Sequence, residues 1–592
     1  MKTVYFFQSQ YSEKYSDYIQ YWLPYTAGCL WAYAKNKVTG WKLGGIQFAR
    51  DNIDEYIQSI EHIDLACFCT YVWNKEYNIK LAKEIKKNFP HCHISFGGPQ
   101  VTVEYLTFSD SICLNEGETN LVSLMEDISN NLDTQKVYKN SRMPSLQNVP
   151  SPYATGVFDD IITNNPEAKW SAVFETNRGC PYSCTFCEWG TGLTGSKIFQ
   201  FDMKRIQAEL EWFAKNPITT MFLADANFGI FKDRDLEIAK LIRKTLSNSS
   251  LEYLSMNYAK NSNARIFEIA KILGPLTKGI TLSAQSMNSD TLTAIKRQNM
   301  KINNFTEMLN LADKYNIETY TEMILGLPFE TKESWKKGIT DLMELGQHNR
   351  VYTQLGNVLP NTEWNTVHRE KHNIKTVKMK KFCKEEAYAN EPDEEFTDFI
   401  VSTDTMSKKD MHESYMYSWV CDQMHYKGYS QIIARWLNVK HNISYKSYYD
   451  SMFTMISNSP QINKEFQRIS NAFLELLNYG SISDTEISPY NLEFISRQIF
   501  FEMIDTCIAF AVRVGNNFVE IPSNVIEIQK RFIKNDMFLV PYEADLDVNL
   551  ETKKFENTTY KFLKTTSHNN FSNNANGTAR GNVIQKNKLI LV

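Results

Sequence analysis

Three cysteines within eight residues impose the strongest constraint on how this chain can fold. Cys180, Cys184 and Cys187 have the spacing C-x3-C-x2-C and follow a strand-like run at residues 170–176. Thiolates this close can bind one metal centre, which requires a compact loop at the end of that strand. Structural zinc takes four ligands and iron–sulfur clusters normally take four cysteines, yet no obvious fourth ligand lies nearby in the sequence. The set of three predicts an iron–sulfur cluster with one iron open to a non-protein ligand; a zinc knuckle or ordinary buried cysteines are the alternatives.

The length of the chain predicts several domains, because 592 residues exceed one ordinary domain. Changes in pattern along the sequence set the expected boundaries. We expect an α/β domain at residues 1–135, a polar linker at 136–165, a second α/β domain at 166–363, a mostly helical domain at 364–560 and a polar, poorly ordered tail at 561–592.

The first domain alternates short strands with helical segments. Strands are expected at residues 4–7, 45–49, 65–70, 93–96 and 111–114, and helices at 18–36 and 76–88. This rhythm predicts a doubly wound parallel sheet of the Rossmann type, in which ligands bind at the carboxyl ends of the strands.

The second domain repeats the strand and helix rhythm six times, which is too few for a complete eight-unit barrel. Polar or small residues end three of its strands, where the catalytic residues of barrels lie. For Asp225, a helix cap is the alternative. The expected strands are residues 172–176, 220–224, 253–258, 279–284, 318–325 and 351–359, with helices at 203–215 and 235–246; the strand-end residues are Asp225, Ala226 and Asn227, then Ser283 and Gln285, then Gly326 and Leu327.

Together with Phe186, which directly precedes the last cysteine, these segments resemble the radical S-adenosylmethionine (SAM) family. The resemblance implies a partial (β/α)6 barrel and a [4Fe–4S] cluster whose open iron binds the amino and carboxylate groups of SAM. It also implies SAM contacts: Phe186 beside the adenine; Asp225, Ala226 and Asn227 near the amino group, where the sequence departs from the family's Gly-Gly-Glu pattern; Ser283 and Gln285 near the ribose or carboxylate; Gly326 and Leu327 under the adenine.

Three strand ends of the first domain resemble the cobalamin-binding domain that precedes many radical SAM cores. Ordinary turns of a flavodoxin-like fold that has lost its ligand are the alternative. Residues 1–130 lack the Asp-x-His-x-x-Gly motif of many cobalamin domains, so the resemblance implies cobalamin without a histidine ligand from the protein. The strand-end residues are Tyr71, Trp73 and Asn74; Gly97, Gly98 and Pro99; and Glu116 and Gly117.

Charge and hydropathy exclude some partners and locations. The formal charge of −4 argues against a general polyanion-binding surface, so nucleic acid is not expected as a partner. The first residues have no signal-peptide pattern, and the longest apolar stretch, residues 499–514, carries three charged residues. We therefore expect a cytoplasmic protein without a membrane segment. The aromatic and Met-rich residues after position 364 are expected in helix cores.

The resemblance implies a cobalamin-dependent methyltransferase that acts on an unactivated carbon of a small-molecule or peptide substrate, with an electron donor such as flavodoxin or ferredoxin. A non-methylating rearrangement or oxidation is one alternative, and a non-catalytic cobalamin or SAM sensor is another. A methylthiotransferase would need a second cluster. Cys67 and Cys69 share one strand face and are better placed for packing than for such a cluster.

Overall fold

The computed structural model describes residues 1–11, 13–14, 18–189, 197–259, 265–277, 279–299, 302–315, 317–381, 395–487, 489, 492 and 495–534, and three short strands near the carboxyl terminus. The chain divides into two compact units. Unit 1 comprises Met1–Thr277, Asn357–Lys371 and Lys380–Asp398, and unit 2 comprises Lys278–Gly356, His372–Met379 and Phe399–Val592.

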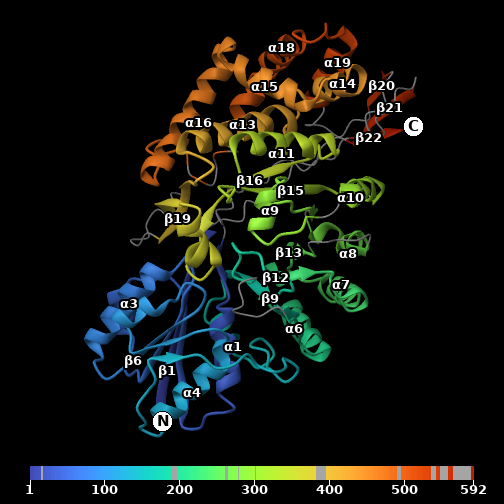
Figure 1. Ribbon diagram of the computed structural model, residues 1–592. Coiled ribbons are helices and arrows are strands. Elements are labelled where there is room, and N and C mark those ends of the chain that lie inside the picture. The colour runs from blue at the N-terminus through green and yellow to red at the C-terminus, as the bar shows by residue number, and fades with distance from the viewer. Residues whose placement is uncertain are drawn as a thin grey trace. The chain divides into compact units, whose positions relative to one another are not determined.

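Unit 1 begins with a six-stranded parallel sheet in the order β4-β1-β5-β6-β7-β8, as the strand and helix rhythm predicted. The chain passes from β1 to its neighbour β4 and then to β5 on the other side of β1. In sheets of this order, ligands bind at the carboxyl ends of the strands beside such a reversal. The elements are β1 (Lys2–Gln10), α1 (Tyr25–Ala34), β4 (Trp41–Ala49), α2 (Ile53–Gln58), β5 (Leu65–Cys69), α3 (Lys75–Asn88), β6 (His93–Gly97), η1 (Val103–Thr107), β7 (Ser111–Cys113), α4 (Gly117–Ser129) and β8 (Val137–Tyr138) (Figure 1).

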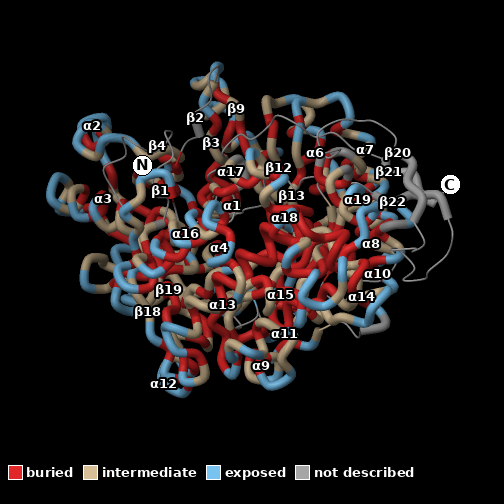
Figure 2. The backbone as a smooth tube through the Cα atoms, turned by 90° about the horizontal axis from the view of Figure 1, so that it is seen from above, coloured by how far each residue is buried: buried red, intermediate tan, exposed pale blue. Residues whose placement is uncertain are grey.

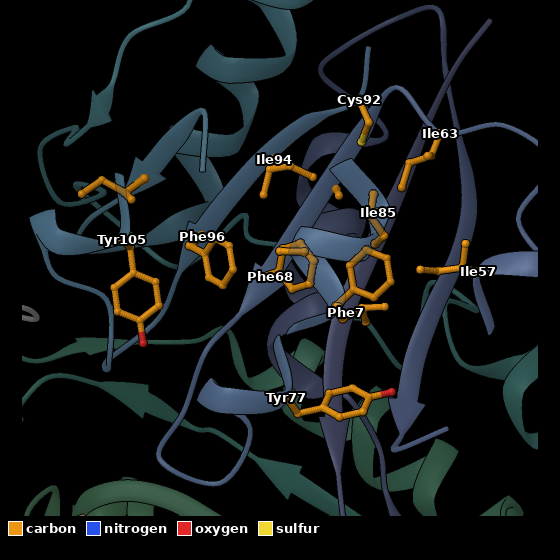
Figure 3. Packing of buried hydrophobic residues seen from close by; sticks show 14 of the residues in the cluster. Phe7, Ile57, Ile63, Phe68, Tyr77, Ile85, Cys92, Ile94, Phe96 and Tyr105 are labelled. Atoms are coloured by element: carbon orange, nitrogen blue, oxygen red, sulfur yellow. The ribbon is translucent and has the colours of Figure 1, made fainter. Parts of the chain in front are cut away.

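Helices cover both faces of this sheet. On one face, Phe7, Phe68 and Phe96 stack in a row with ring centroids 4.6 Å apart at each step, beneath α2 and α3 (Figure 3). The outer residues of α2 are exposed (Figure 2). On the other face, Cys67 and Cys69 pack with residues of α1 and α4. Burial on both faces is typical of parallel sheets, and the two cysteines have the packing role that was predicted.

A second sheet of unit 1 has the order β13-β12-β9-β3-β2. Its first four strands are parallel to their neighbours, and β2 is antiparallel to β3. Helices α6 and α7 match the expected helices in position. The elements are β2 (Glu13–Lys14), β3 (Ile19–Trp22), α5 (Asp159–Thr163), β9 (Ala168–Phe174), β10 (Asn177–Arg178), β11 (Phe199–Gln200), α6 (Met203–Lys215), β12 (Ile218–Phe228), α7 (Lys232–Leu246), β13 (Tyr253–Tyr258), α8 (Arg265–Leu273), η2 (Gly274–Leu276), β17 (Asn357–Val358), η3 (Trp364–His368) and α12 (Arg369–Lys371).

The helix expected at residues 18–36 is wrong at its start, because β3 occupies residues 19–22 and α1 begins only at Tyr25. Long-range partners select the strand. The Gln20 side chain donates to Ser171 Oγ at 2.5 Å, and the Tyr21 ring packs on Trp170 with centroids 5.6 Å apart. No local pattern in the sequence reports these contacts.

Unit 2 contains a parallel sheet in the order β14-β15-β16. The strand expected at residues 279–284 is reduced to two paired residues, because Gln285 has a left-handed backbone (φ +67°) and rejoins β15 only through an isolated bridge to Met323. The strand expected at 351–359 is divided at Gly356 into β16, which ends at Leu355, and β17, residues 357–358. The elements are β14 (Ile280–Thr281), α9 (Ser289–Ala294), α10 (Ile302–Tyr315), β15 (Thr319–Leu325), α11 (Lys332–Glu344) and β16 (Val351–Leu355).

The carboxyl-terminal part is mostly helical, as expected, although two strands, β18 (Lys375–Lys381) and β19 (Glu395–Ser402), precede the helices. Aromatic side chains such as Tyr417 and Trp419 of α13 are buried, which confirms their predicted core role. Most of the tail predicted at 561–592 lies outside the described residues. None of the described helices is long and apolar enough to cross a membrane. The elements are α13 (Lys408–Cys421), η5 (Asp422–Tyr426), α14 (Gln431–His441), α15 (Tyr445–Met455), η6 (Ile456–Asn458), α16 (Pro460–Tyr479), α17 (Arg497–Glu502), α18 (Ile504–Gly515), α19 (Ser523–Lys534), β20 (Tyr542–Leu546), β21 (Thr558–Leu563) and β22 (Lys588–Leu591).

Candidate functional site

The cysteine loop follows the carboxyl end of β9, as predicted. Cys180 and Cys184 are 2% and 1% exposed; Cys187 is half-buried and its backbone N–H donates to the Cys184 carbonyl at 3.2 Å. Gly179 starts the loop with φ +115°, and a Cβ at this position would lie 2.5 Å from the carbonyl oxygen of Lys197. The turn into the loop therefore requires glycine.

The donor chemistry of this loop fits an iron–sulfur cluster, because thiolates are the ligands that such clusters take. In the ranges that the structure describes, no three His, Cys, Asp or Glu side chains form a group that could already hold a metal ion, and the three cysteines are included in that statement. The loop also has a donor aimed at one of its sulfurs. The Asn227 side-chain amide, at the end of β12, donates to Cys180 Sγ at 3.3 Å.

Asp225 anchors the segment that leads into the cysteine loop. Its fully buried carboxylate accepts from the backbone N–H groups of Thr176 and Asn177 at 2.7 and 3.1 Å, from the Asn177 side chain at 2.6 Å and from the Thr176 hydroxyl. Burial raises the pKa of Asp225 to about 7, against the effect of these bonds. Asp225 therefore connects β12 to the loop, and Ala226 is buried beside it. Contact of these two residues with SAM stays a prediction.

Arg178, two residues before Cys180, is held in a largely buried ion network. Its guanidinium donates to both carboxylate oxygens of Glu175 at 3.0 Å and to Glu118 of α4 at 2.9 Å. The side chains of Arg178 and Glu118 are 14% and 5% exposed. Burial opposes ionisation of Glu118, but Arg178 holds its pKa below the ordinary value. The carboxylate of Glu118, on helix α4 of the first sheet, thus holds Arg178 at the entrance of the cysteine loop.

Glu116 and Gly117, predicted as cobalamin contacts, lie at the start of α4. The Glu116 carboxylate accepts from Arg142 at 3.2 Å and from the backbone N–H of Met143 at 2.9 Å. Gly117 allows close packing, because a Cβ there would lie 2.8 Å from a methyl group of Leu30. Both residues therefore have structural partners within unit 1, and their contact with cobalamin stays a prediction.

The loop after β5 carries Tyr71, Trp73 and Asn74. The rings of Tyr71 and Trp73 stack with centroids 4.5 Å apart and planes within 4°. Asn74 is fully buried and shapes the loop: it donates to the carbonyls of Ser9 and Cys69 at 3.1 Å and accepts from the Tyr71 N–H at 2.8 Å. The buried indole N–H of Trp73 has no hydrogen-bond partner in the described part of the chain. An unsatisfied donor at this sheet edge fits a ligand site.

The Gly97-Gly98-Pro99 loop after β6 lies directly against the end of β5. Gly98 has φ +110°, and a Cβ there would lie 2.6 Å from the carbonyl oxygen of Thr70. Gly97 is half-buried and Gly98 is exposed. The structure thus brings the loops after β5 and β6 together at the carboxyl edge of the sheet, where a large ligand can approach backbone without side chains between.

The remaining predicted SAM contacts belong to unit 2, at the carboxyl ends of β14 and β15. Gln285 is 8% exposed, and the Ser283 carbonyl accepts from Arg297 at 2.7 Å. Gly326 follows β15 with φ +101°, and Leu327 is fully buried. These four positions lie on adjacent parallel strand ends, as predicted, but the cysteine loop and Asp225–Asn227 belong to the other unit. Joint contact with one ligand stays a prediction.

One ion pair in unit 1 joins residues 345 positions apart. Glu395 accepts from Arg50 Nη2 at 2.6 Å and from the backbone N–H groups of Glu76 and Tyr77 at 2.9 and 3.2 Å, so it caps the first turn of α3. Arg50 also donates to the Trp73 carbonyl at 2.7 Å. This pair holds the Trp73 loop from a distant part of the sequence, and no local signal could have indicated it.

A second long-range contact comes from the segment after β17. The Asn361 side-chain amide donates to the carbonyls of Pro99 and Val101 at 2.8 and 3.1 Å. Trp364 packs on Phe186, the residue predicted beside the adenine, with ring centroids 5.8 Å apart. These contacts touch both the loop after β6 and the cysteine loop, and sequence reasoning missed them.

The sequence matches one family model and two named relatives. Residues 174–342 match the family model of the Radical SAM superfamily. The chain is 33% identical over 470 residues to the cobalamin-dependent radical SAM methyltransferase TokK of Streptomyces tokunonensis. The matched region covers 74% of this chain and 68% of that protein. It is also 33% identical over 460 residues to the 2-(S-pantetheinyl)-carbapenam-3-carboxylate methyltransferase of Streptantibioticus cattleyicolor, covering 73% and 67% respectively.

Among solved structures, the radical SAM methyltransferase TsrM of Kitasatospora setae, with tryptophan substrate and a SAM analogue bound, is 16% identical. Its TM-score is 0.47, and the match covers 65% of this chain and 79% of that chain. The identity and coverage of the two sequence relatives decide the assignment. This chain belongs to the family of cobalamin-dependent radical SAM methyltransferases.

Proposed function

We propose that this enzyme uses a [4Fe–4S] cluster to cleave SAM reductively and a cobalamin to methylate an unactivated carbon of its substrate. The observation that carries the proposal is the buried C-x3-C-x2-C loop, which belongs to the same compact unit as a parallel sheet edged by Trp73 and Gly98. Cys180, Cys184 and Cys187 would hold the cluster. An electron donor such as flavodoxin or ferredoxin would reduce it.

When bound, the cluster and SAM supply a 5′-deoxyadenosyl radical, and the cobalamin supplies the methyl group. The residues of this chain orient and tune these groups. Asn227 donates a hydrogen bond toward Cys180 Sγ, and Arg178 and Asp225 keep the loop entrance in one conformation. The stacked rings of Tyr71 and Trp73 would form an apolar wall at the cobalamin edge.

The cobalt is proposed to lack a histidine ligand from the first sheet. The three histidines of residues 1–130 are at the amino ends of strands, opposite the predicted cobalamin edge. His62 hydrogen-bonds Asp64 at 2.9 Å just before β5, and its ring stacks on that of His91 with centroids 5.4 Å apart. His93, the first residue of β6, hydrogen-bonds Ser111 Oγ at 2.9 Å. These positions support the proposal.

The proposed domain organisation keeps the sequence boundaries: a cobalamin-binding sheet at 1–135, a linker at 136–165, a barrel at 166–363, a helical domain at 364–560 and a tail at 561–592. In this proposal β9, β12, β13, β14, β15 and β16 are the strands of a partial (β/α)6 barrel. Support comes from their parallel pairing in two runs of three, β9-β12-β13 and β14-β15-β16.

A small-molecule substrate is favoured over a peptide. The relative from S. cattleyicolor is named for a carbapenam-3-carboxylate, and it is 33% identical to this chain over 73% of its length. We therefore take a carboxylate-bearing carbapenam as the first substrate class to test.

The test begins with anaerobic purification, cluster reconstitution and addition of hydroxocobalamin. We expect a corrinoid absorbance that elutes with the protein, and a product that gains the mass of one methyl group when SAM, a reductant and the carbapenam carboxylate are supplied. An intact cluster without bound corrinoid would refute the methyltransferase proposal and leave a non-methylating radical enzyme. Bound corrinoid without any SAM cleavage would instead indicate a sensor.

A further inference from the structure

We propose that residues 360–364, named here the strap, couple the cobalamin-side loop to the cysteine loop, and that Asn361 and Trp364 are positioning residues for methyl transfer. This inference rests on the proposed function, because the two loops that the strap contacts are the proposed cobalamin and cluster sites. The contacts that carry it lie within unit 1.

The first end of the strap holds the loop after β6. One amide group, Asn361 Nδ2, donates to two carbonyl oxygens, those of Pro99 and Val101, at 2.8 and 3.1 Å. Those acceptors directly follow Gly97 and Gly98, the glycines at the predicted cobalamin edge. Only a residue with an NH₂ group at this place can satisfy both carbonyls; an aspartate would face them with a negative charge.

The other end of the strap holds the cysteine loop. The backbone N–H of Trp364 donates to the carbonyl of Thr185 at 3.2 Å, and the Trp364 ring, 2% exposed, packs on Phe186. Thr185 and Phe186 lie between Cys184 and Cys187. A displacement of Trp364 would therefore be transmitted directly to the cysteine loop.

The strap is short and is hydrogen-bonded to the residues on either side of it, which couples the positions of its two ends. Three peptide units separate Asn361 from Trp364, which limits their Cα separation to about 11 Å. The Thr362 hydroxyl donates to the Leu359 carbonyl at 2.8 Å, and the Asn365 side chain donates to the Pro360 carbonyl at 2.9 Å. The chain then enters η3, a π-helical turn of the kind often found at functional sites.

Two buried polar atoms lie at this contact. Trp364 Nε1 and Thr185 Oγ1 are buried and have no hydrogen-bond partner in the described residues. Leaving such groups unsatisfied is costly. Both atoms belong to the pair of residues that joins the strap to the cysteine loop.

Hydrogen–deuterium exchange on the apoprotein tests the coupling without any turnover. Asn361→Ala should increase exchange at residues 97–101, which it contacts, and also at 180–187. Trp364→Leu should increase exchange at residues 180–187, which it contacts, and also at 97–101, because coupling between sites is reciprocal. Asn349→Ala is the matched control: Asn349 is half-buried in unit 2 and donates to Thr319 Oγ1 at 3.4 Å. It should change neither loop.

With cofactors loaded, Asn361→Ala should keep the cluster but bind hydroxocobalamin about fivefold to tenfold more weakly, the effect of losing one or two hydrogen bonds. It should also form less methylated product for each 5′-deoxyadenosine released. Trp364→Phe should restore much of the exchange protection that Trp364→Leu loses.

Increased exchange confined to the loop that the substituted residue contacts, with an unchanged product ratio, would overturn the coupling. If the wild-type protein makes no methylated product at all, the proposed function fails, but the reciprocal exchange still decides whether the strap couples the loops.

Discussion

Replacing Glu395 with alanine tests whether a residue distant in sequence supports the predicted cobalamin edge. The Glu395 carboxylate is fully buried and accepts from Arg50 and from two N–H groups of the first turn of α3. Asn74, the residue before α3, makes no capping bond of its own from its side chain. Arg50 connects this capping arrangement to the Trp73 carbonyl.

The expected cost follows from the burial of the pair. The Arg50 side chain is 2% exposed, so Glu395→Ala removes a carboxylate that pairs with a buried guanidinium, which costs about 3–5 kcal/mol. Loss of the cap on α3 contributes about 1 kcal/mol more. We therefore expect the free energy of unfolding of unit 1 to fall by about 4–6 kcal/mol, with lower exchange protection across α3 and weaker hydroxocobalamin binding.

Urea denaturation and hydrogen–deuterium exchange measure this effect. The double variant Arg50→Met/Glu395→Met should be less destabilised than Glu395→Ala, because it removes both charges of the buried pair together. Glu84→Ala, which removes an exposed pair with Lys87, is the surface control and should leave the free energy of unfolding nearly unchanged. A loss below about 1 kcal/mol in Glu395→Ala, or equal losses in the single and double variants, would refute the reasoning.

Two further predictions concern the cofactor loops. Gly98→Ala should destabilise the chain by about 1–3 kcal/mol and weaken corrinoid binding, because Gly98 has a left-handed backbone and its Cβ would press on Thr70. Gly97→Ala is the control and should be tolerated, because its Cβ would meet only ordinary contacts at 3.5 Å. Equal losses of stability in urea denaturation of the two variants would contradict this prediction. In the apoprotein, without a cluster, burial raises the pKa of Glu188 from 4.5 to about 7. Between these pH values the folded apoprotein keeps a proton that the unfolded chain has lost, so its free energy of unfolding should fall by up to about 3 kcal/mol as the pH rises through that window. Glu188→Gln should remove this dependence in denaturation curves at several pH values; an unchanged slope would disprove it.

Local patterns were enough to predict the parallel sheet of the first domain and most strands of the second. Apolar strands and amphipathic helices such as α3 can be predicted from their local sequence pattern. Glycines at strand ends indicate places where the backbone packs closely, such as the contact of Gly98 with Thr70. The failure at residues 19–22 has a different cause: β3 forms because of partners at Ser171 and Trp170, about 150 residues away.

The supports of the candidate site were the part that sequence could not predict. Asp225 was interpreted as a cofactor contact, but its carboxylate is occupied by four donors from two residues of the loop entrance. Glu395 and Asn361 carry no local motif, since each acts through contacts more than 250 residues away. Such residues become visible only when the fold brings distant segments together.

The cluster assignment is tested most directly by electron paramagnetic resonance of the reduced, reconstituted protein with and without SAM. Wild type and Cys507→Ala, which alters a buried cysteine of α18, should both show a [4Fe–4S]⁺ signal that changes when SAM is added. Cys184→Ala should lose the bound iron, the signal and SAM cleavage. A cluster signal that persists in Cys184→Ala, or a wild-type loop that binds zinc and gives no signal, would contradict the account.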